Sequence, residues 1–170
     1  MARSADSELE TRFERLFLAY QQPILNYLYR MVGDLSRAED LAQETFVKAY
    51  RALTRLPHDA NERAWVYRIA TNTARDWHRR HRLIQWMPLL DNDTDSKNGN
   101  PAGNVVEAQA VEQALSNLPP KYAAPLVLYS VQGFSTAEIA EVMHISQSAV
   151  KVRLYRARKL FREVYGRDGR

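Results

Sequence analysis

The chain contains no cysteine, and this absence excludes several kinds of chemistry. Disulfide bonds, zinc sites with thiolate ligands and thiol-based redox sensing all require cysteine side chains. Long apolar runs are missing as well, because no uninterrupted stretch approaches the roughly 18 residues of a membrane helix. The N-terminal residues MARSADSELETRF lack the apolar centre of a signal peptide. We therefore expect a cytoplasmic protein without a membrane span.

Residue patterns suited to catalysis or metal binding are scarce too. Of the four histidines, only His78 and His81 are expected to share a helix face, with Asp76 nearby. They lie in a cluster of arginines, whose positive field opposes a bound cation. The sequence has no glycine-rich phosphate loop and no nucleophile beside a base. We expect no metal, no cofactor, no small-molecule ligand and no intrinsic catalysis.

Strand-like alternation is also absent, and apolar residues recur at spacings of three and four along most of the chain. This pattern predicts an all-α fold. Four helices are predicted in the first half. Ser7 and Glu10 cap the first helix, and the second begins at Pro23 and stops at Gly33. Ser36 and Glu39 cap the third helix, which runs to about Leu53, and the fourth begins near Asp59–Glu62 and reaches the basic cluster that ends at Arg82.

Residues 88–104, PLLDNDTDSKNGNPAGN, interrupt the helical pattern. They are rich in Asp, Asn, Gly, Ser and Pro, and such a segment cannot bury enough apolar surface to offset the entropy of ordering it. We interpret it as a flexible acidic linker. The sequence thus predicts two small helical domains, residues 1–87 and residues 105–170, in place of one continuous core.

The most informative segment is residues 134–161, FSTAEIAEVMHISQSAVKVRLYRARKLF. Ser135 and Glu138 form a capping box before a short helix, His144 and Ile145 supply a turn, and Ser146 caps a second helix. This rhythm predicts a helix-turn-helix. The second helix has an apolar stripe of Val150, Leu154, Ala157 and Phe161, and an opposite face of Ser148, Lys151, Val152, Tyr155, Arg156 and Lys159.

That opposite face suits a helix that reads the major groove of DNA. Cations contact phosphates, forked and polar side chains read base edges, and apolar side chains contact thymine methyl groups. Val152 fits a methyl contact, although single exposed apolar residues are also common. A second basic cluster, residues 75–82, holds four arginines and two histidines. The chain therefore has two separate patches for a polyanion.

An acidic and amide patch is predicted in the segment AEDLAQETFVKAYRAL, which begins at Ala38. Gln43 and Glu44 follow Asp40 at spacings of three and four, so all three project from one side of a helix. With Leu41 beside them as exposed aliphatic surface, they suit docking onto a basic partner helix. On spacing alone, an ordinary solvated helix face is the simpler interpretation.

Three segments in order resemble the extracytoplasmic-function (ECF) sigma factors, the small bacterial initiation subunits of RNA polymerase. The segments are AEDLAQETFVKAYRAL, AWVYRIATNTARDWHRR and LPPKYAAPLVLYSVQGFSTAEIAEVMHISQSAVKVRLYRAR, and the match covers residues 13–162 with only the linker unconstrained. The resemblance implies a subunit that binds core RNA polymerase at the clamp helices of its largest subunit and at its flap, and that recognises the minus-ten and minus-thirty-five elements of promoter DNA. Many relatives are restrained by an anti-sigma factor, but nothing in this sequence names one.

The resemblance also implies roles for particular residues. The residues implied to dock on core polymerase are Asp40, Leu41, Gln43 and Glu44. Contact with the opened minus-ten strand falls to Asn61, Asn72, Arg75, Asp76, Trp77, Arg79 and Arg80, with residues 59–63 as the loop that receives a flipped base and Trp77 or Tyr67 as the ring on which a base stacks. The minus-thirty-five element is read by Ser148, Lys151, Val152, Arg153, Tyr155, Arg156 and Lys159. Ser148 replaces a frequent glycine and Val152 a frequent small polar residue, so the DNA sequence recognised is not predicted.

Two other interpretations compete with a sigma factor. A stand-alone helix-turn-helix regulator would carry an effector or dimerisation domain and would bind a duplex operator by itself. An adaptor that binds only proteins would leave both basic clusters without a function. In the family, acidic linker residues can mimic nucleic acid, and Asp91, Asp93 and Asp95 fit that role and ordinary linker composition equally well.

Overall fold

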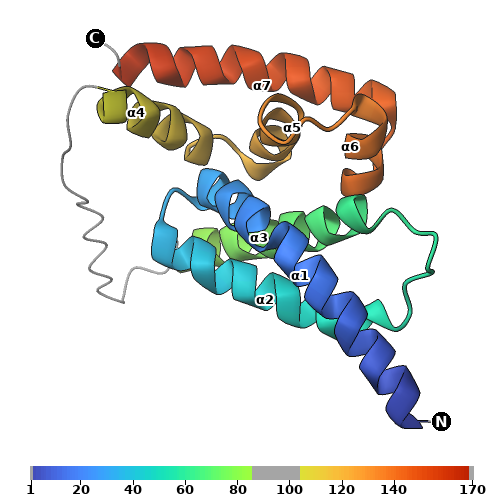
Figure 1. Cartoon of the computed structure of the whole chain (residues 1–170). Helices are drawn as coiled ribbons and strands as arrows, with labels where there is room; N and C mark the ends of the chain where they lie inside the picture. Colours follow the sequence, from blue (N-terminus) through green and yellow to red (C-terminus); the bar gives the residue numbers. More distant parts are fainter. Residues whose placement is uncertain (1, 86–103, 169–170) are drawn as a thin grey trace.

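The structure is a computed structural model that describes residues 2–85 and 104–168. Within these ranges the chain forms seven helices and no strand, which confirms the all-α prediction (Figure 1). The helices are α1 (Ala2–Val32), α2 (Leu35–Leu53), α3 (Glu62–Gln85), α4 (Asn104–Ser116), α5 (Pro120–Ser130), α6 (Thr136–Met143) and α7 (Gln147–Asp168). The predicted linker and its acidic residues lie outside the described residues, except for Asn104, which begins α4.

Helices α1, α2 and α3 make the first module, residues 2–85, around a shared apolar core (Figure 1). Tyr27 and Leu28 of α1, Leu53 of α2 and Val66 of α3 are all fully buried in it. The Tyr27 hydroxyl lies 2.8 Å from Thr71 Oγ1. Because the Thr71 hydroxyl donates to the carbonyl of Tyr67, Tyr27 is the donor to Thr71. Burial raises the pKa of Tyr27 far above its usual value, so this buried hydroxyl stays protonated.

The predicted break at Pro23 is wrong, because α1 continues through this residue. Proline has no backbone N–H to donate, and it is therefore unfavourable in the interior of a helix. The residues that follow, including Ile24, Tyr27 and Leu28, are fully buried. Tertiary packing of these side chains outweighs the local preference, as it does for most helices in proteins.

The predicted capping residues of the first and third helices are also wrong. Ser7 lies inside α1, where its carbonyl accepts a hydrogen bond from the Thr11 hydroxyl at 2.8 Å. The N-cap of α2 is Asp34, whose carboxylate accepts from the backbone N–H of Arg37 at 2.8 Å. Asp34 follows directly on Gly33, which ends α1 in a left-handed conformation.

Helices α4 to α7 make the second module, residues 104–168, which contains the predicted helix-turn-helix. The capping box of Ser135 and Glu138 is present at the start of α6, and His144 adopts a left-handed conformation after it, with a φ of 52°. The Ser146 hydroxyl accepts from the N–H of Ala149 at 3.1 Å and caps α7. The predicted stripe of α7 faces inward, with Val150, Leu154 and Ala157 buried and Phe161 packed against the core.

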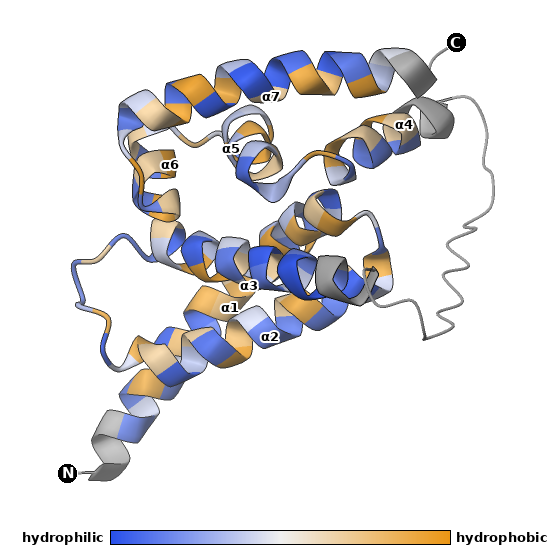
Figure 2. Ribbon diagram, turned by 180° about the vertical axis from the view of Figure 1, so that it is seen from behind, coloured by the Kyte–Doolittle hydropathy of each residue, from blue (hydrophilic) through white to orange (hydrophobic). Residues whose placement is uncertain are grey.

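The two modules pack against each other. Helices α4, α5 and α6 contact α1 and α3, and one apolar cluster runs from the first module into the second. Figures 1 and 2 show the second module along one side of the first, with α7 on the side away from α1, α2 and α3. Packing against the first module therefore leaves the outer face of α7 uncovered.

Candidate docking and nucleic-acid interfaces

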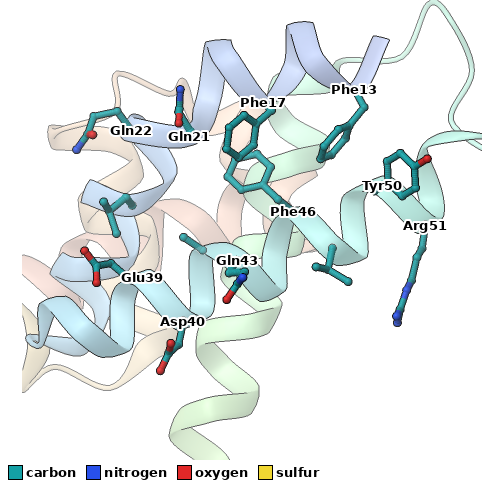
Figure 3. A pocket seen from close by; sticks show the side chains of 13 residues that line it. Phe13, Phe17, Gln21, Gln22, Glu39, Asp40, Gln43, Phe46, Tyr50 and Arg51 are labelled. Atoms are coloured by element: carbon teal, nitrogen blue, oxygen red, sulfur yellow. The ribbon is translucent and has the colours of Figure 1, made fainter. Parts of the chain in front are cut away.

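An apolar groove of about 930 Å³ lies between α1 and α2 (Figure 3). Its walls are aromatic: Phe13 meets Tyr50 edge to face at 5.0 Å between ring centroids, and Phe17 meets Phe46 in the same way at 4.9 Å. Edge-to-face pairs hold rings in defined orientations. The polar groups at the groove are Gln21, Gln22, Glu39, Asp40, Gln43 and Arg51. The result is a preformed apolar surface with a polar rim.

The structure brings two of the predicted docking residues to this rim. Asp40 and Gln43 are exposed there (Figure 3). Glu44 is half-buried, and its carboxylate pairs with Lys48 at 2.7 Å. Lys48 also donates to the Thr73 hydroxyl of α3 at 3.2 Å. Glu44 is therefore partly neutralised within the chain, and Asp40 is the more available carboxylate.

The prediction that Leu41 forms exposed aliphatic surface is wrong, because only 3% of this side chain is exposed. Leu41 lies one turn from the buried residues Ala38 and Thr45, so the helical period places it on the inner side of α2. Phe17 of α1 is exposed at the groove, and on α2 the exposed apolar residues there are Val47 and Tyr50 instead. Sequence reasoning missed both, although the phase of the buried stripe places them on the outer side.

The predicted minus-ten residues form a polar and cationic face along α3. Asn72, Arg75, Arg79 and Arg80 are exposed, and Asp76 is half-buried. Arg75 donates to the Asn72 side-chain oxygen at 3.0 Å, and Arg79 pairs with Asp76 at 3.3 Å. Asn72 and Asp76, the two residues expected to hydrogen-bond a base, thus each lie beside an arginine side chain. The side chain of Arg82 is outside the described part of the chain.

Asn61 has a structural function in addition to its predicted contact with DNA. Its side-chain oxygen accepts from the backbone N–H of Ala64 at 3.0 Å, which makes Asn61 the cap of α3. The side chain is nevertheless exposed. It therefore fixes the orientation of residues 59–61 relative to α3, whereas Glu62 and Arg63, the last two residues of the predicted loop, belong to the first turn of α3.

The two aromatic residues predicted as stacking rings have different surroundings. Tyr67 is 2% exposed and packs against Tyr27 and Phe134, so in this arrangement it offers no face to a base. Trp77 is half-buried and lies nearly parallel to the His81 ring, at 4.9 Å and 12°. The Arg37 guanidinium of α2 lies 5.4 Å from the Trp77 ring centroid. Arg37 is a further cation of this face, and sequence reasoning missed it because it comes from another helix.

The histidines of α3 belong to packing contacts. His78 Nε2 donates to the carbonyl of Met31 at 2.8 Å and joins α3 to α1. No group of three or more His, Cys, Asp or Glu side chains in the described ranges is placed to hold a metal ion. The helices described by the structure also include none long and apolar enough to cross a bilayer.

The predicted minus-thirty-five face of α7 is open to solvent. Ser148, Lys151, Val152, Tyr155, Arg156 and Lys159 are exposed, and Arg153 is half-buried. Val152 is 49% exposed and Tyr155 is 71% exposed. Hydrogen bonding by Arg156 and the charge of Lys121 lower the pKa of the Tyr122 phenol of α5. The exposed Arg156 side chain therefore also interacts with α5 of its own module.

Comparisons with known proteins agree with this architecture. Residues 16–84 match the family Sigma-70 region 2, and residues 108–161 match the family Sigma-70, region 4. The chain is 36% identical to RNA polymerase sigma factor YlaC of Bacillus subtilis (strain 168), over 85% of this chain and 87% of that protein. It is 30% identical to ECF RNA polymerase sigma factor SigW of the same organism, over 85% of this chain and 83% of that protein.

Solved structures resemble the fold across both modules. One is CnrH in complex with the cytosolic domain of CnrY, with a TM-score of 0.72, 26% identity, and coverage of 98% of this chain and 96% of that chain. Another is the sigma factor RpoE in complex with the anti-sigma factor NepR from Bartonella quintana, with a TM-score of 0.70, 21% identity, and coverage of 90% and 96%. The chain belongs to the ECF sigma factors of the sigma-70 family, the alternative sigma factors for transcription initiation by RNA polymerase.

Proposed function

We propose that this sigma factor performs no catalysis of its own and works by divided binding. The first module docks on core polymerase and holds the opened minus-ten strand, while α7 reads the minus-thirty-five duplex. The observation that carries this proposal is that the three predicted surfaces are exposed at separate places on one fold: the groove rim, the outer face of α3 and the outer face of α7. Two weak DNA contacts become a strong one when both modules are held on one polymerase.

Docking on polymerase is assigned to the groove between α1 and α2. Its aromatic walls fit the apolar stripe of a partner helix, and its rim offers carboxylates to arginine or lysine side chains of that helix. Asp40 has no salt bridge within the described residues, so its exposed carboxylate is free to accept an arginine fork. Leu41 contributes to docking only indirectly, because its buried side chain packs in the core and holds α2 in place.

DNA contact is assigned to α3 and α7. On α3, Asn72 and Asp76 supply polar groups for a base edge, Trp77 supplies a ring, and the arginines contact the flanking phosphates. On α7, Arg156 and Lys151 suit base edges and phosphates of a duplex, and Val152 suits a thymine methyl group. Asn61 orients the loop that receives the flipped base.

An anti-sigma factor is a further partner that we propose for this chain. The RpoE structure contains one, and the CnrH structure contains the cytosolic domain of CnrY. A helix of such a protein in the groove between α1 and α2 would compete with core polymerase for Asp40 and the aromatic walls. Binding of either partner would then exclude the other.

The test is transcription with purified core polymerase and promoter fragments from the genome that encodes the chain. We expect discrete start sites that depend on the chain. Replacing both rim residues, Asp40→Ala and Gln43→Ala, should weaken polymerase binding about tenfold. Arg156→Ala should leave polymerase binding unchanged and weaken binding of the minus-thirty-five duplex by about 1–3 kcal/mol.

The controls are exposed residues outside the proposed surfaces, one on α1 beside the groove and one on α7. Glu14→Ala removes a carboxylate from α1, and Arg162→Ala removes a cation from α7. Both should transcribe as the unchanged chain does. Absence of a discrete start site on every promoter would overturn the proposed function, and equal loss of both activities in the rim and Arg156 variants would contradict the division of roles.

A further inference from the structure

Arg12 of α1 is a largely buried cation beside the loop that joins α2 to α3, and only 10% of its side chain is exposed. Its Nε donates to Glu62 Oε1 at 2.9 Å. Its Nη1 donates to the carbonyl of Leu56 at 3.0 Å, and its Nη2 donates to the carbonyl of Pro57 at 3.1 Å. Each nitrogen of one planar guanidinium thus binds a different acceptor.

The three acceptors lie at both ends of the loop. Leu56 and Pro57 come shortly after the end of α2, whereas Glu62 is the first residue of α3. The Pro57 carbonyl also accepts from the backbone N–H of Ala60 at 3.2 Å, which closes a turn over residues 57–60. Arg12 therefore ties the entry and the exit of the loop to α1.

Loss of Arg12 would leave these acceptors without their donor. The Glu62 side chain is only 22% exposed, and the hydrogen bond to Leu56 is partly buried. An acceptor that is left unpaired away from bulk water is costly, so the loop should shift until water reaches it. A groove of about 440 Å³ borders Arg12, Leu56 and Pro57 and gives the loop room to move. The position of the loop thus depends on Arg12.

Arg15 of the same helix provides a natural comparison. Its guanidinium lies 3.9 Å from the same oxygen of Glu62, but 72% of its side chain is exposed. An ion pair that is this exposed contributes little to stability. Replacing Arg15 therefore removes a positive charge beside Glu62 without releasing the carbonyls of Leu56 and Pro57.

We propose that Arg12 is a positioning residue for promoter opening, because it fixes residues 59–63 in the shape that receives the flipped base. The inference rests on the function proposed above for these residues. A preformed pocket binds a base better than a mobile loop, which must first be ordered at a cost in binding free energy. All three nitrogens of Arg12 are already bonded, so Arg12 acts on the base through the loop.

Removal of single bases from the minus-ten strand tests this inference. Holoenzyme is assembled from core polymerase and the unchanged chain or Arg12→Ala, and it binds a promoter fragment with an unpaired minus-ten region. With the unchanged chain, loss of the flipped base should weaken binding about tenfold. With Arg12→Ala, the same loss should weaken binding less than about twofold, while the losses at the other positions stay as they were. Affinity for core polymerase should not change, because Arg12 does not line the groove between α1 and α2.

Two further variants separate the geometry of Arg12 from its charge and from its effect on folding. Arg15→Ala is the matched control and should keep the dependence on the flipped base. If Arg12→Ala disturbs folding, which circular dichroism would reveal, Arg12→Lys keeps the charge but not the planar fork. It should show the same loss of base dependence. Full base dependence in the Arg12 variants, or equal weakening at every position, would overturn the inference.

Amide hydrogen exchange in the free chain tests the position of the loop without DNA. The Ala60 amide should exchange about tenfold faster in Arg12→Ala than in the unchanged chain, and Arg15→Ala should leave it unchanged. An unaltered rate in Arg12→Ala would overturn the inference whatever the DNA experiment shows. If the unchanged holoenzyme is insensitive to every base removed, the function proposed for the loop fails, and the inference fails with it. If only the unchanged response of Arg12→Ala contradicts expectation, the sigma function stands and the role of Arg12 is wrong.

Discussion

Leu41 and Asp40 are adjacent in sequence but contribute to different properties of the protein. The Leu41 side chain is buried in the core of the first module, whereas Asp40 is exposed at the groove rim. A helix turns by about 100° per residue, so neighbours readily lie on different faces. Loss of polymerase binding in a Leu41 variant would therefore report misfolding, and loss in an Asp40 variant would report docking.

Leu41→Ala should lower the free energy of unfolding by about 2–5 kcal/mol, because it leaves a cavity in a packed core. Asp40→Ala should change it by less than about 0.5 kcal/mol, because the side chain is solvated and unpaired. Urea unfolding followed by circular dichroism measures both. A Leu41→Ala chain that is as stable as the unchanged chain but binds polymerase poorly would show that Leu41 is part of the docking surface after all.

Single residues also mark the limit of what the sequence predicts. The cap by Ser146 and the stripe from Val150 to Phe161 were predictable, because their partners lie within a few residues. The helix break predicted at Pro23 is wrong because burial of the side chains in the next turn outweighs the local preference of proline. Arg37 was missed because its partner, Trp77, lies on another helix.

At the scale of an element, α6 depends on a cap that also makes its stability pH-dependent. The backbone N–H of Ser135 donates to the Glu138 carboxylate at 2.8 Å, and this hydrogen bond lowers the pKa of Glu138 below its usual 4.5. The folded chain therefore favours the charged carboxylate. That contribution is complete above about pH 4.5 and is lost as the pH falls through the lowered pKa.

Glu138→Gln keeps a side chain that can cap but removes the titrating group. The stability difference between the two proteins should be largest above pH 4.5 and should shrink as the pH falls below it. Thermal unfolding between pH 3 and 6 measures this difference. Glu141→Gln, an exposed change on the same helix, should leave the pH profile of the unchanged chain intact. A Glu138→Gln difference that is constant over the whole range would contradict the capping argument.

At the scale of the whole molecule, the sequence predicted the all-α fold but not how the modules meet. The hydrogen bond between Tyr67 and Gln132 joins residues that are 65 positions apart. No local pattern distinguishes such a tyrosine from one that stacks on a base, so Tyr67 was a candidate ring for DNA. Burial assigns it to the contact between the two modules instead, where its ring packs against Phe134.

The packed, closed arrangement of the two modules should open at high pH, because Tyr67 must stay neutral to remain buried between them. Burial raises the pKa of Tyr67 to about 12 from its usual 10.0, although Arg63 nearby opposes the shift. Below pH 10 the phenol is neutral in the closed and the open chain, so its contribution to closure is complete. Between pH 10 and 12 the phenol ionises in the open chain first, and that contribution is lost. The measurement is energy transfer between a donor and an acceptor dye on two introduced cysteines, Ala19→Cys on α1 and Glu163→Cys on α7, which should fall over this range when Tyr67 is present. Tyr67→Phe cannot ionise and should show a smaller fall, whereas Tyr155→Phe, an exposed change on α7, should behave as the unchanged chain. An identical fall in the Tyr67→Phe chain would mean that the phenol does not contribute to closure.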